Sequence, residues 1–294
     1  MSFGSTLGIG FMRALAHMPL PLIRGLGAVL GRVLHTVAVP RRRVVDTNLA
    51  LCFPGKSAGE RRRIARETFV LVAQSWLDRG WLWHASPAVV ASRIRVVGAP
   101  AEIDEIAHGT APMILFAPHF YGLDAAATGL TMHTARPSTT IYTTQRDPMV
   151  DEWIRVGRAR FGNVITLNRT DGPKPVIAGL RKGGLLYLLP DMDFGRDQSV
   201  FVPFFGVPVA TVPSLSRFAR LGRAKVVPIL SRVVKGGYEI EVLPAWQDFP
   251  TDDVVADTAL MNERLAGYIE TMPAQYYWVH RRFKTRPEGA PTLY

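Results

Sequence analysis

The chain of 294 residues has a single cysteine, Cys52, which excludes an internal disulfide bond and a cysteine-based metal cluster. It also lacks the G-x-x-x-x-G-K-[ST] loop and the H-E-x-x-H motif. The first absence argues against a P-loop nucleotide site and the second against a zinc metalloprotease. A lone cysteine, interpreted as a small buried hydrophobe, fits a reducing environment on the cytoplasmic side.

Acidic residues are absent from Phe3 to Val39, and no apolar run there reaches the roughly 18 to 20 residues of a membrane-spanning helix. On a helical wheel the polar side chains of this segment gather on one side: Arg13, His17, Arg24, Arg32 and His35. We therefore predict an interfacial amphipathic membrane anchor over residues 1–40, interrupted near Pro19 and Pro21. The alternatives are a core helix and a signal peptide; the latter is disfavoured because neither a positive leader nor a small-residue cleavage site is present.

The formal net charge of +11 suits anionic partners: nucleic acid, anionic lipid, a phosphorylated substrate or an acidic carrier protein. The basic cluster Pro40–Arg43 would suit anionic headgroups, or it is a solvated surface run. Residues Trp278–Pro287 mix aromatic and cationic side chains, a composition that can stack on bases. No helix-turn-helix, zinc-finger or RRM signature accompanies them, so we expect no nucleic-acid partner.

The rest of the chain has the pattern of an α/β domain. Ser57 and Glu60 match a capping box, which predicts a long helix over Arg61–Trp83. From about Arg93, short apolar runs alternate with helical stretches. Strands are expected at Ile94–Val97, Met113–Phe116, Thr140–Thr143, Val164–Thr166, Leu185–Leu189, Val226–Leu230 and Tyr238–Leu243, and helices at Leu123–Met132, Met149–Arg160, Pro173–Lys182, Pro213–Leu221 and Asp257–Thr271. We predict a mixed, largely parallel sheet flanked by helices, forming one domain over residues 41–294 behind the N-terminal helical extension.

His119 and Asp124 are the first candidate catalytic residues. The apolar run Pro112–Ala117 delivers the histidine to the end of an expected strand, where open α/β sheets place their ligands. An imidazole titrates near neutrality and can take a proton from a hydroxyl, and a carboxylate on its other nitrogen would fix its tautomer. If the substrate supplies the hydroxyl, this is the chemistry of an acyltransferase; a structural His–Asp contact is the alternative.

A second polar group follows another expected strand. Asp191 and Asp193, with Gly195 behind them, could bind a metal or a sugar, or could cap a turn. The aromatic run Phe201–Pro208 that follows could line a tunnel for an acyl chain or could be buried in the core. Arginines in the middle of the chain suggest a site for an anionic headgroup: Arg146, Arg155, Arg158, Arg160 and Arg169.

These motifs resemble those of the bacterial lipid A biosynthesis acyltransferases, the Kdo-dependent lauroyl-type enzymes within the lysophospholipid acyltransferase group that carries an H-x4-D/E motif. The likeness covers almost the whole chain and is most specific in the run His280–Pro287. Its other parts are Asn48–Pro54, His119 to Asp124, Pro190–Gly195, Phe201–Gly206 and the final Leu293-Tyr294. Many members have glutamate where Asp124 stands and glutamine where Met192 stands.

The resemblance implies an O-acyltransferase that needs no metal or other cofactor. The donor would be a fatty acyl thioester of acyl carrier protein. The acceptor would be a hydroxyacyl chain of a Kdo-bearing lipid A precursor at the cytoplasmic face of the bacterial inner membrane, so the enzyme would serve lipopolysaccharide biosynthesis. His119 would deprotonate the acceptor hydroxyl and Asp124 would orient the imidazole. Substrate contacts would come from Arg146, Arg158, Arg160, Arg169, Asp191 and Asp193, with Arg158 as the best match to the family's arginine.

The sequence is also compatible with two other functions. A related acyltransferase could act on a lysophospholipid, an ornithine lipid or another glycolipid. A protein that binds anionic lipid without chemistry would keep its function when His119 is replaced, whereas the enzyme would lose several orders of magnitude in rate.

Overall fold

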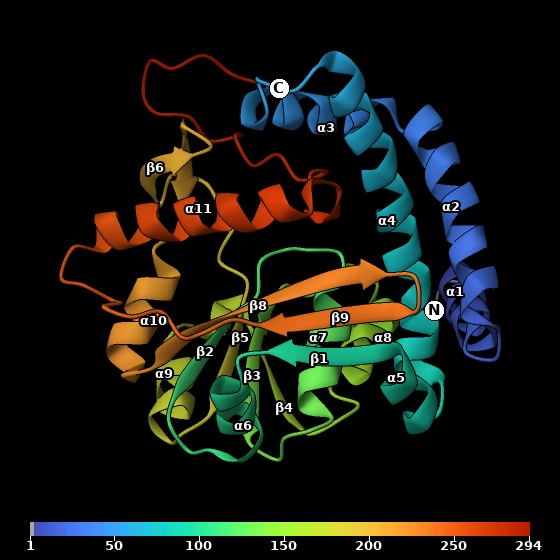
Figure 1. The fold of residues 1–294 in the computed structure, drawn as a ribbon, viewed down its shortest axis with the longest axis horizontal. Coiled ribbons are helices and arrows are strands. Elements are labelled where there is room, and N and C mark those ends of the chain that lie inside the picture. Colours follow the sequence, from blue (N-terminus) through green and yellow to red (C-terminus); the bar gives the residue numbers. More distant parts are fainter. Residues whose placement is uncertain (1–2) are drawn as a thin grey trace.

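The computed structural model describes residues 3–294, which form a seven-stranded sheet covered by helices (Figure 1). In spatial order the strands are β1 (Ile94–Gly98), β9 (Gly237–Val242), β8 (Lys225–Val234), β2 (Met113–Phe116), β5 (Leu185–Leu188), β3 (Pro137–Tyr142) and β4 (Asn163–Asn168). The described neighbours in this sheet are parallel except for β8 and β9, which are antiparallel. The predicted mixed, largely parallel α/β fold is therefore confirmed.

The described helices are α1 (Phe3–Leu15), α2 (Leu20–Val37), α3 (Val39–Cys52), α4 (Ala58–His84), α5 (Pro87–Arg93), α6 (Pro100–His108), α7 (Leu123–Thr131), α8 (Pro148–Arg158), α9 (Lys174–Arg181), α10 (Ser214–Gly222) and α11 (Val254–Thr271), with short 3-10 turns at Arg169–Asp171 and Pro273–Gln275. Every expected strand and helix of the α/β part is found within a few residues of its predicted bounds. The sequence did not predict α3, α5, α6 or the antiparallel hairpin β6 (Val200–Phe204) and β7 (Val207–Thr211).

The capping box predicted at the start of α4 is present. The Ser57 hydroxyl accepts a hydrogen bond from the Glu60 backbone N–H at 3.2 Å, and the Glu60 carboxylate accepts one from the Ser57 backbone N–H at 2.8 Å. These two bonds satisfy donors that the first turn of a helix leaves free.

Alternate residues of β2 point to opposite faces of the sheet and enter two hydrophobic cores. Leu115 packs with side chains of α4, α6, α7 and α8, and Phe116 packs with side chains of α9, α10 and α11. The two cores hold the sheet between two helical layers, and its central strands β2, β5 and β3 present their carboxyl ends at one edge.

The C-terminal run of aromatic and cationic residues is part of the core. Trp278, Arg282 and Phe283 are buried, and Arg282 donates hydrogen bonds to the Ala210 carbonyl at 2.8 Å and the Thr211 hydroxyl at 2.7 Å. The hairpin formed by β6 and β7 packs here, with Phe204 between Tyr276 and Phe283. The side chains of Trp278, Arg282 and Phe283 are therefore not placed to stack on nucleic-acid bases. In the run Phe201–Pro208, Phe204 is buried and Phe205 packs against the core, whereas Pro203 and Gly206 are exposed.

The N-terminal helices α1 and α2 are separated by a short break before Leu20, as the two prolines predicted. Helix α2 lies along α4 at one side of the molecule (Figure 1). Gly27 and Gly31 allow this close approach, because a Cβ at either position would come within 3.0 Å of the α4 backbone at Gln74 or Val70.

A buried ion pair joins α2 to the α/β part. Arg24 Nη2 lies 2.9 Å from Asp78 Oδ2 of α4, and Asp78 also accepts hydrogen bonds from Trp81 Nε1 at 2.9 Å and the Tyr238 hydroxyl at 2.6 Å. We call these four residues the junction cluster. Burial raises the pKa of Asp78 despite the neighbouring Arg24 and the hydrogen bonds.

The polar face of α2 points toward the protein and its apolar face points outward. Two polar residues of the predicted stripe face the protein: Arg24 enters the junction cluster, and the ring of His35 lies 5.4 Å from that of Phe69. The outward face is apolar and consists of Leu22, Leu26, Val29, Leu30, Val33 and Val37, each more than 40% exposed. Leu7 and Phe11 of α1 are exposed as well. Helix α2 is long and apolar enough to cross a membrane. Because one side of it packs on α4, only its apolar outward face is free, and this arrangement favours a helix that lies on the membrane surface.

Candidate active site

A cavity of about 800 Å³ opens at the carboxyl ends of β2, β5 and β3. Its walls come from both faces of the sheet: Leu130 of α7 and Tyr187 of β5 on one side, Val176 of α9 and Phe218 of α10 on the other. His119 and Asp124 both line it. This is the position in which open α/β sheets bind ligands.

His119 is paired with Asp191. The imidazole Nδ1 lies 2.7 Å from Asp191 Oδ1, and the His119 backbone N–H donates to Asp191 Oδ2 at 3.0 Å. Asp191 is fully buried while the His119 side chain is 20% exposed. Burial would raise the pKa of Asp191, but the charge of His119 and the hydrogen bonds from His119 and Tyr276 lower it. The carboxylate therefore accepts the Nδ1 proton, and Nε2 of a neutral imidazole keeps its lone pair for a proton from the substrate.

The loop that carries His119 is fixed by the C-terminal segment. The Tyr277 backbone N–H donates to the His119 carbonyl and the Tyr121 N–H donates to the Gln275 carbonyl, both at 3.0 Å. Phe120 and Tyr276 pair in an antiparallel bridge between these bonds. The segment thus acts as a short extra strand that holds the imidazole at the end of β2.

Asp124 has different partners from those that the sequence predicted. Its Oδ2 accepts from Arg79 Nε at 2.8 Å and its Oδ1 accepts from Arg158 Nε at 2.9 Å. Burial alone would raise the pKa of Asp124, but the charges and hydrogen bonds of Arg158 and Arg79 lower it to about 2. We call these three residues the cavity cluster. The prediction that Asp124 orients the imidazole is not what the geometry shows, because Asp191 takes that place.

Arg79 was missed by the sequence analysis, although a signal was present. It follows Val72 and Trp76 at helical spacing on the apolar stripe of α4, where a charged residue needs a partner. Its guanidinium lies 4.0 Å from the Trp76 ring and 5.5 Å from the Trp83 ring. The Trp83 ring also packs against Gly157 of α8, and a Cβ on Gly157 would lie only 2.2 Å from that ring. This close contact brings the next residue, Arg158, to Asp124.

The other residues predicted to bind substrate are placed as follows. Arg169 lines the cavity, and its guanidinium lies 3.9 Å from the Phe194 ring. Arg146 is exposed and is not among the lining residues. Arg160 lies outside the cavity and donates hydrogen bonds to the carbonyls of Leu82 and Ala85.

Asp193 supports the loop instead of facing the cavity. Its carboxylate accepts hydrogen bonds from the Thr285 backbone N–H at 2.7 Å, the Thr285 hydroxyl at 2.8 Å and the Gly195 N–H at 2.9 Å. The Asp193 N–H donates to His280 Nε2 at 3.0 Å, and burial with the nearby Arg282 lowers the pKa of His280 to about 4. The Asp191–Asp193 turn is therefore joined to the C-terminal run, with Asp191 on His119. Among residues 3–294 no cluster of histidine, cysteine and carboxylate side chains is arranged to hold a metal.

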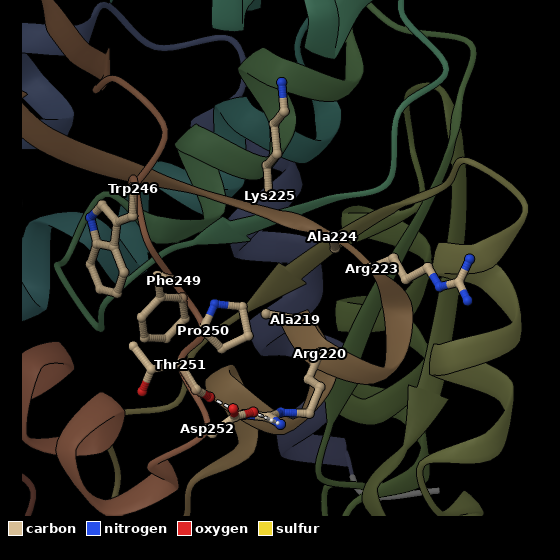
Figure 2. A pocket seen from close by; sticks show the side chains of 10 residues that line it. All are labelled: Ala219, Arg220, Arg223, Ala224, Lys225, Trp246, Phe249, Pro250, Thr251 and Asp252. Carbon is tan, nitrogen blue, oxygen red and sulfur yellow. Dashed lines mark hydrogen bonds and ion pairs between the residues drawn. The ribbon is translucent and has the colours of Figure 1, made fainter.

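A second hollow of about 500 Å³ lies at the opposite, amino end of β8 (Figure 2). In Figure 2 Arg220 turns toward Thr251 and Asp252, with which it forms a hydrogen bond and a 2.8 Å ion pair, while Arg223 and Lys225 extend away. Its described lining contains no histidine. The acid–base pair lies in the larger cavity, so we assign the chemistry there.

Residues 1–285 match the family model described as bacterial lipid A biosynthesis acyltransferase. A lipid A biosynthesis acyltransferase of Haemophilus influenzae is 34% identical over 98% of this chain and 89% of its own length. The lipid A biosynthesis lauroyltransferase of Escherichia coli is 34% identical over 98% and 94%, and the palmitoleoyltransferase of the same organism is 30% identical over 98% and 93%.

Proposed function

Since this chain belongs to the family of bacterial lipid A biosynthesis acyltransferases, we propose that it moves a fatty acyl group from an acyl carrier protein thioester to a hydroxyacyl chain of a Kdo-bearing lipid A precursor. Because the chain belongs to this family, it is an acyltransferase. The thioester donor and the Kdo-bearing acceptor are our finer proposal. The observation that carries it is the bond from His119 Nδ1 to Asp191, which leaves Nε2 as a base in a cavity large enough for an acyl chain.

The chemistry follows from this pair. Nε2 of His119 takes the proton of the acceptor's hydroxyl as the hydroxyl oxygen attacks the thioester carbonyl carbon. Asp191 stabilises the imidazolium that forms, because its carboxylate faces Nδ1. When the tetrahedral intermediate collapses, the carbon–sulfur bond breaks and the imidazolium returns its proton to the leaving thiolate. The products are an ester and a free thiol, and His119 is neutral again.

The cavity cluster prepares the site for a negatively charged acceptor. Two arginines flank one carboxylate, so the cluster carries one surplus positive charge. Asp124 holds both guanidinium groups in fixed orientations, which reduces the freedom that they would lose on binding an anion. Arg169, whose guanidinium lies over Phe194, is a third cation at the cavity. Phosphates and Kdo carboxylates are ligands of the required sign.

The apolar part of the cavity suits the acyl chain. Leu115, Ala127 and Leu130 line the cavity on one face of the sheet, and the lining also includes the small polar side chains of Thr131 and Ser138. The names of the relatives differ in the acyl group, lauroyl in one and palmitoleoyl in another. The acyl length used by this chain therefore depends on its own lining residues.

We propose that the enzyme works at the cytoplasmic surface of the inner membrane, and the outward face of α1 and α2 supports its attachment to a membrane. The exposed leucine, valine and phenylalanine side chains of this face would enter the headgroup–acyl boundary of an anionic leaflet. Trp76 is also exposed and lines the cavity on α4, the helix that α2 packs against. We infer that the same side of the molecule meets the membrane and admits the lipid acceptor.

The test uses the purified full chain, acyl carrier protein thioesters of several lengths and two acceptors. One acceptor is the tetra-acylated, Kdo-bearing lipid A precursor, and the other is a lysophospholipid. Mass spectrometry should find one added acyl group on the precursor with the wild-type chain and none with His119→Ala. A product on the lysophospholipid alone would favour the alternative acceptor class. A folded wild-type chain that acylates neither would contradict the enzyme proposal.

A further inference from the structure

Two hydrogen-bond donors of the cavity have no partner. In the described part of the chain, seven side-chain nitrogen or oxygen atoms are buried without a hydrogen bond, and two of them belong to residues that line the cavity: the hydroxyl of Tyr121 and Nη1 of Arg79. Proteins pair nearly all such groups, because a buried donor without an acceptor destabilises the fold. Arg79 already holds Asp124 through its Nε, but the Tyr121 hydroxyl has no structural task.

The position of Tyr121 is set by groups other than its hydroxyl. The residue follows His119 by two positions, and its backbone N–H is bonded to Gln275 at 3.0 Å. The ring of Tyr277 lies 6.1 Å from the rings of both Tyr121 and His119. Tyr121 is 7% exposed and packs in the core that contains Phe120 and Tyr276. A rigidly held tyrosine two residues after the catalytic base thus carries a buried hydroxyl that has no hydrogen-bond partner in the protein.

We propose that the Tyr121 hydroxyl donates a hydrogen bond to the thioester carbonyl oxygen as that oxygen becomes an oxyanion, and so acts as a further catalytic residue. This inference rests on the proposed function. In the transition state the acceptor oxygen forms a bond to the carbonyl carbon, and the carbonyl oxygen gains the negative charge that the donor stabilises. When the carbon–sulfur bond breaks the charge leaves that oxygen, and the hydroxyl keeps its proton throughout.

Two physical features favour this role. Burial raises the pKa of Tyr121 well above its usual value, and the hydroxyl remains a donor at any pH at which His119 can serve as base. A donor fixed before the reaction does not have to reorient as charge develops, which is the basis of oxyanion stabilisation. The unpaired state in the free protein is then a destabilising feature that the reaction uses.

The test is Tyr121→Phe, which removes one oxygen atom and keeps the ring. We expect kcat to fall by about 10²-fold, as when one oxyanion donor is removed, with little change in KM for the thioester. The pH–rate profile should keep its midpoint because the His119–Asp191 pair is untouched. The melting temperature should stay the same or rise, since the variant no longer buries an unpaired hydroxyl.

Tyr268→Phe is the matched control. Its hydroxyl lies outside the cavity and accepts a hydrogen bond from Trp246 Nε1 at 3.3 Å. This variant should lower the melting temperature slightly and leave kcat within about twofold, the reverse of the pattern expected for Tyr121→Phe.

Three results with Tyr121→Phe would overturn the inference while the proposed function stands: an unchanged kcat, a raised KM alone, or a fall in kcat that accompanies a fall in melting temperature. The first would show that the hydroxyl does not act, the second a contact made equally in the ground state, and the third a structural hydroxyl. A wild-type chain inactive on every acceptor would overturn both proposals.

Discussion

Two neighbouring residues of α4 belong to two carboxylate–arginine clusters in different regions of the molecule. Asp78 lies in the junction cluster and pairs with Arg24 of α2, whereas Arg79 lies in the cavity cluster and pairs with Asp124. Both carboxylates are buried. Yet the pKa of Asp78 is raised, and that of Asp124 is lowered to about 2.

The number of arginines explains the difference. One arginine and two neutral donors do not offset the burial of Asp78, whereas Arg79 and Arg158 together more than offset the burial of Asp124. The junction cluster is therefore an ion pair that joins α2 to the α/β part, and the cavity cluster carries surplus positive charge and contains a carboxylate that is ionised at neutral pH. Changes at the junction should act on stability, and changes around the cavity should act mainly on the reaction.

The largest effect is expected from Asp191→Asn in the cavity. The amide cannot accept the Nδ1 proton as the carboxylate does, so the imidazole is left in the wrong tautomer and kcat should fall by about 10³- to 10⁴-fold. Acyl transfer to the lipid A precursor measures the loss. Denaturant unfolding is the control, and its free energy should change by less than about 2 kcal/mol. Equal losses of activity and folded protein would assign Asp191 to stability.

At the junction, Arg24→Ala should act on stability instead. It leaves the buried Asp78 without its cation, which typically costs about 3 kcal/mol. A carboxyl group whose pKa is raised by folding favours the folded state below its unfolded pKa of about 4, and this stability is lost as the pH rises through the folded-state pKa. The destabilisation should thus be largest at neutral pH and shrink on acidification.

Urea unfolding at a series of pH values measures this effect. Arg32→Ala, which changes an exposed arginine of the same helix, is the matched control and should cost less than about 0.5 kcal/mol. A penalty for Arg24→Ala that grows toward acid would show that Asp78 does not behave as described.

For Asp124→Asn, the pH dependence of stability should have the opposite cause to that at the junction, because the folded state lowers the pKa of Asp124 and raises that of Asp78. The carboxylate gains stability from its two arginines above its unfolded pKa of about 4, and this stability, about 2 kcal/mol, is lost as the pH falls through about 2. The variant should be less stable than the wild type at neutral pH, and the difference should close between pH 4 and pH 2. Its kcat should fall by about 10²-fold because Arg79 and Arg158 lose their fixed orientation. A difference in stability that persists at pH 2 would contradict the assignment.

The smallest effect on the folded protein is expected on the outward face of α2. Val29 is 60% exposed, so Val29→Asp should change the free energy of unfolding by less than about 0.5 kcal/mol. Binding to vesicles that contain anionic lipid should fall by about tenfold, as measured by co-sedimentation, because a charge enters the apolar face. Val29→Leu is the control and should bind as the wild type does. Equal binding by all three proteins would remove α2 from the membrane contact.

The sequence predicted the sheet, the long helix and the histidine at a strand end, because each depends on local periodicity and capping. It did not predict the partner of His119. Asp191 lies 72 positions away, and the two meet because β2 and β5 are adjacent and parallel, in register from Met113 with Leu185. Strand order follows from the packing of the whole sheet, so spacing alone favoured the nearer carboxylate, Asp124.

The helical wheel gave the polar stripe of α2 but not its direction. A wheel shows which side chains share a face, and a partner decides whether that face turns inward. For α2 the partner is Asp78 on α4, which draws Arg24 inside and leaves Leu26 and Val29 outside. A polar stripe on an otherwise apolar helix is therefore also compatible with a buried ion pair and an outward apolar face.

Membrane attachment through the outward face of α2, as proposed above, would have a kinetic consequence. An enzyme held on a leaflet meets a lipid acceptor by diffusion in two dimensions, and the acylated product stays in the same leaflet. The rate should then follow the surface mole fraction of the acceptor and not its bulk concentration. Diluting the acceptor with inert lipid, at a constant total amount of acceptor, would slow the reaction, and adding more vesicles of unchanged composition would not.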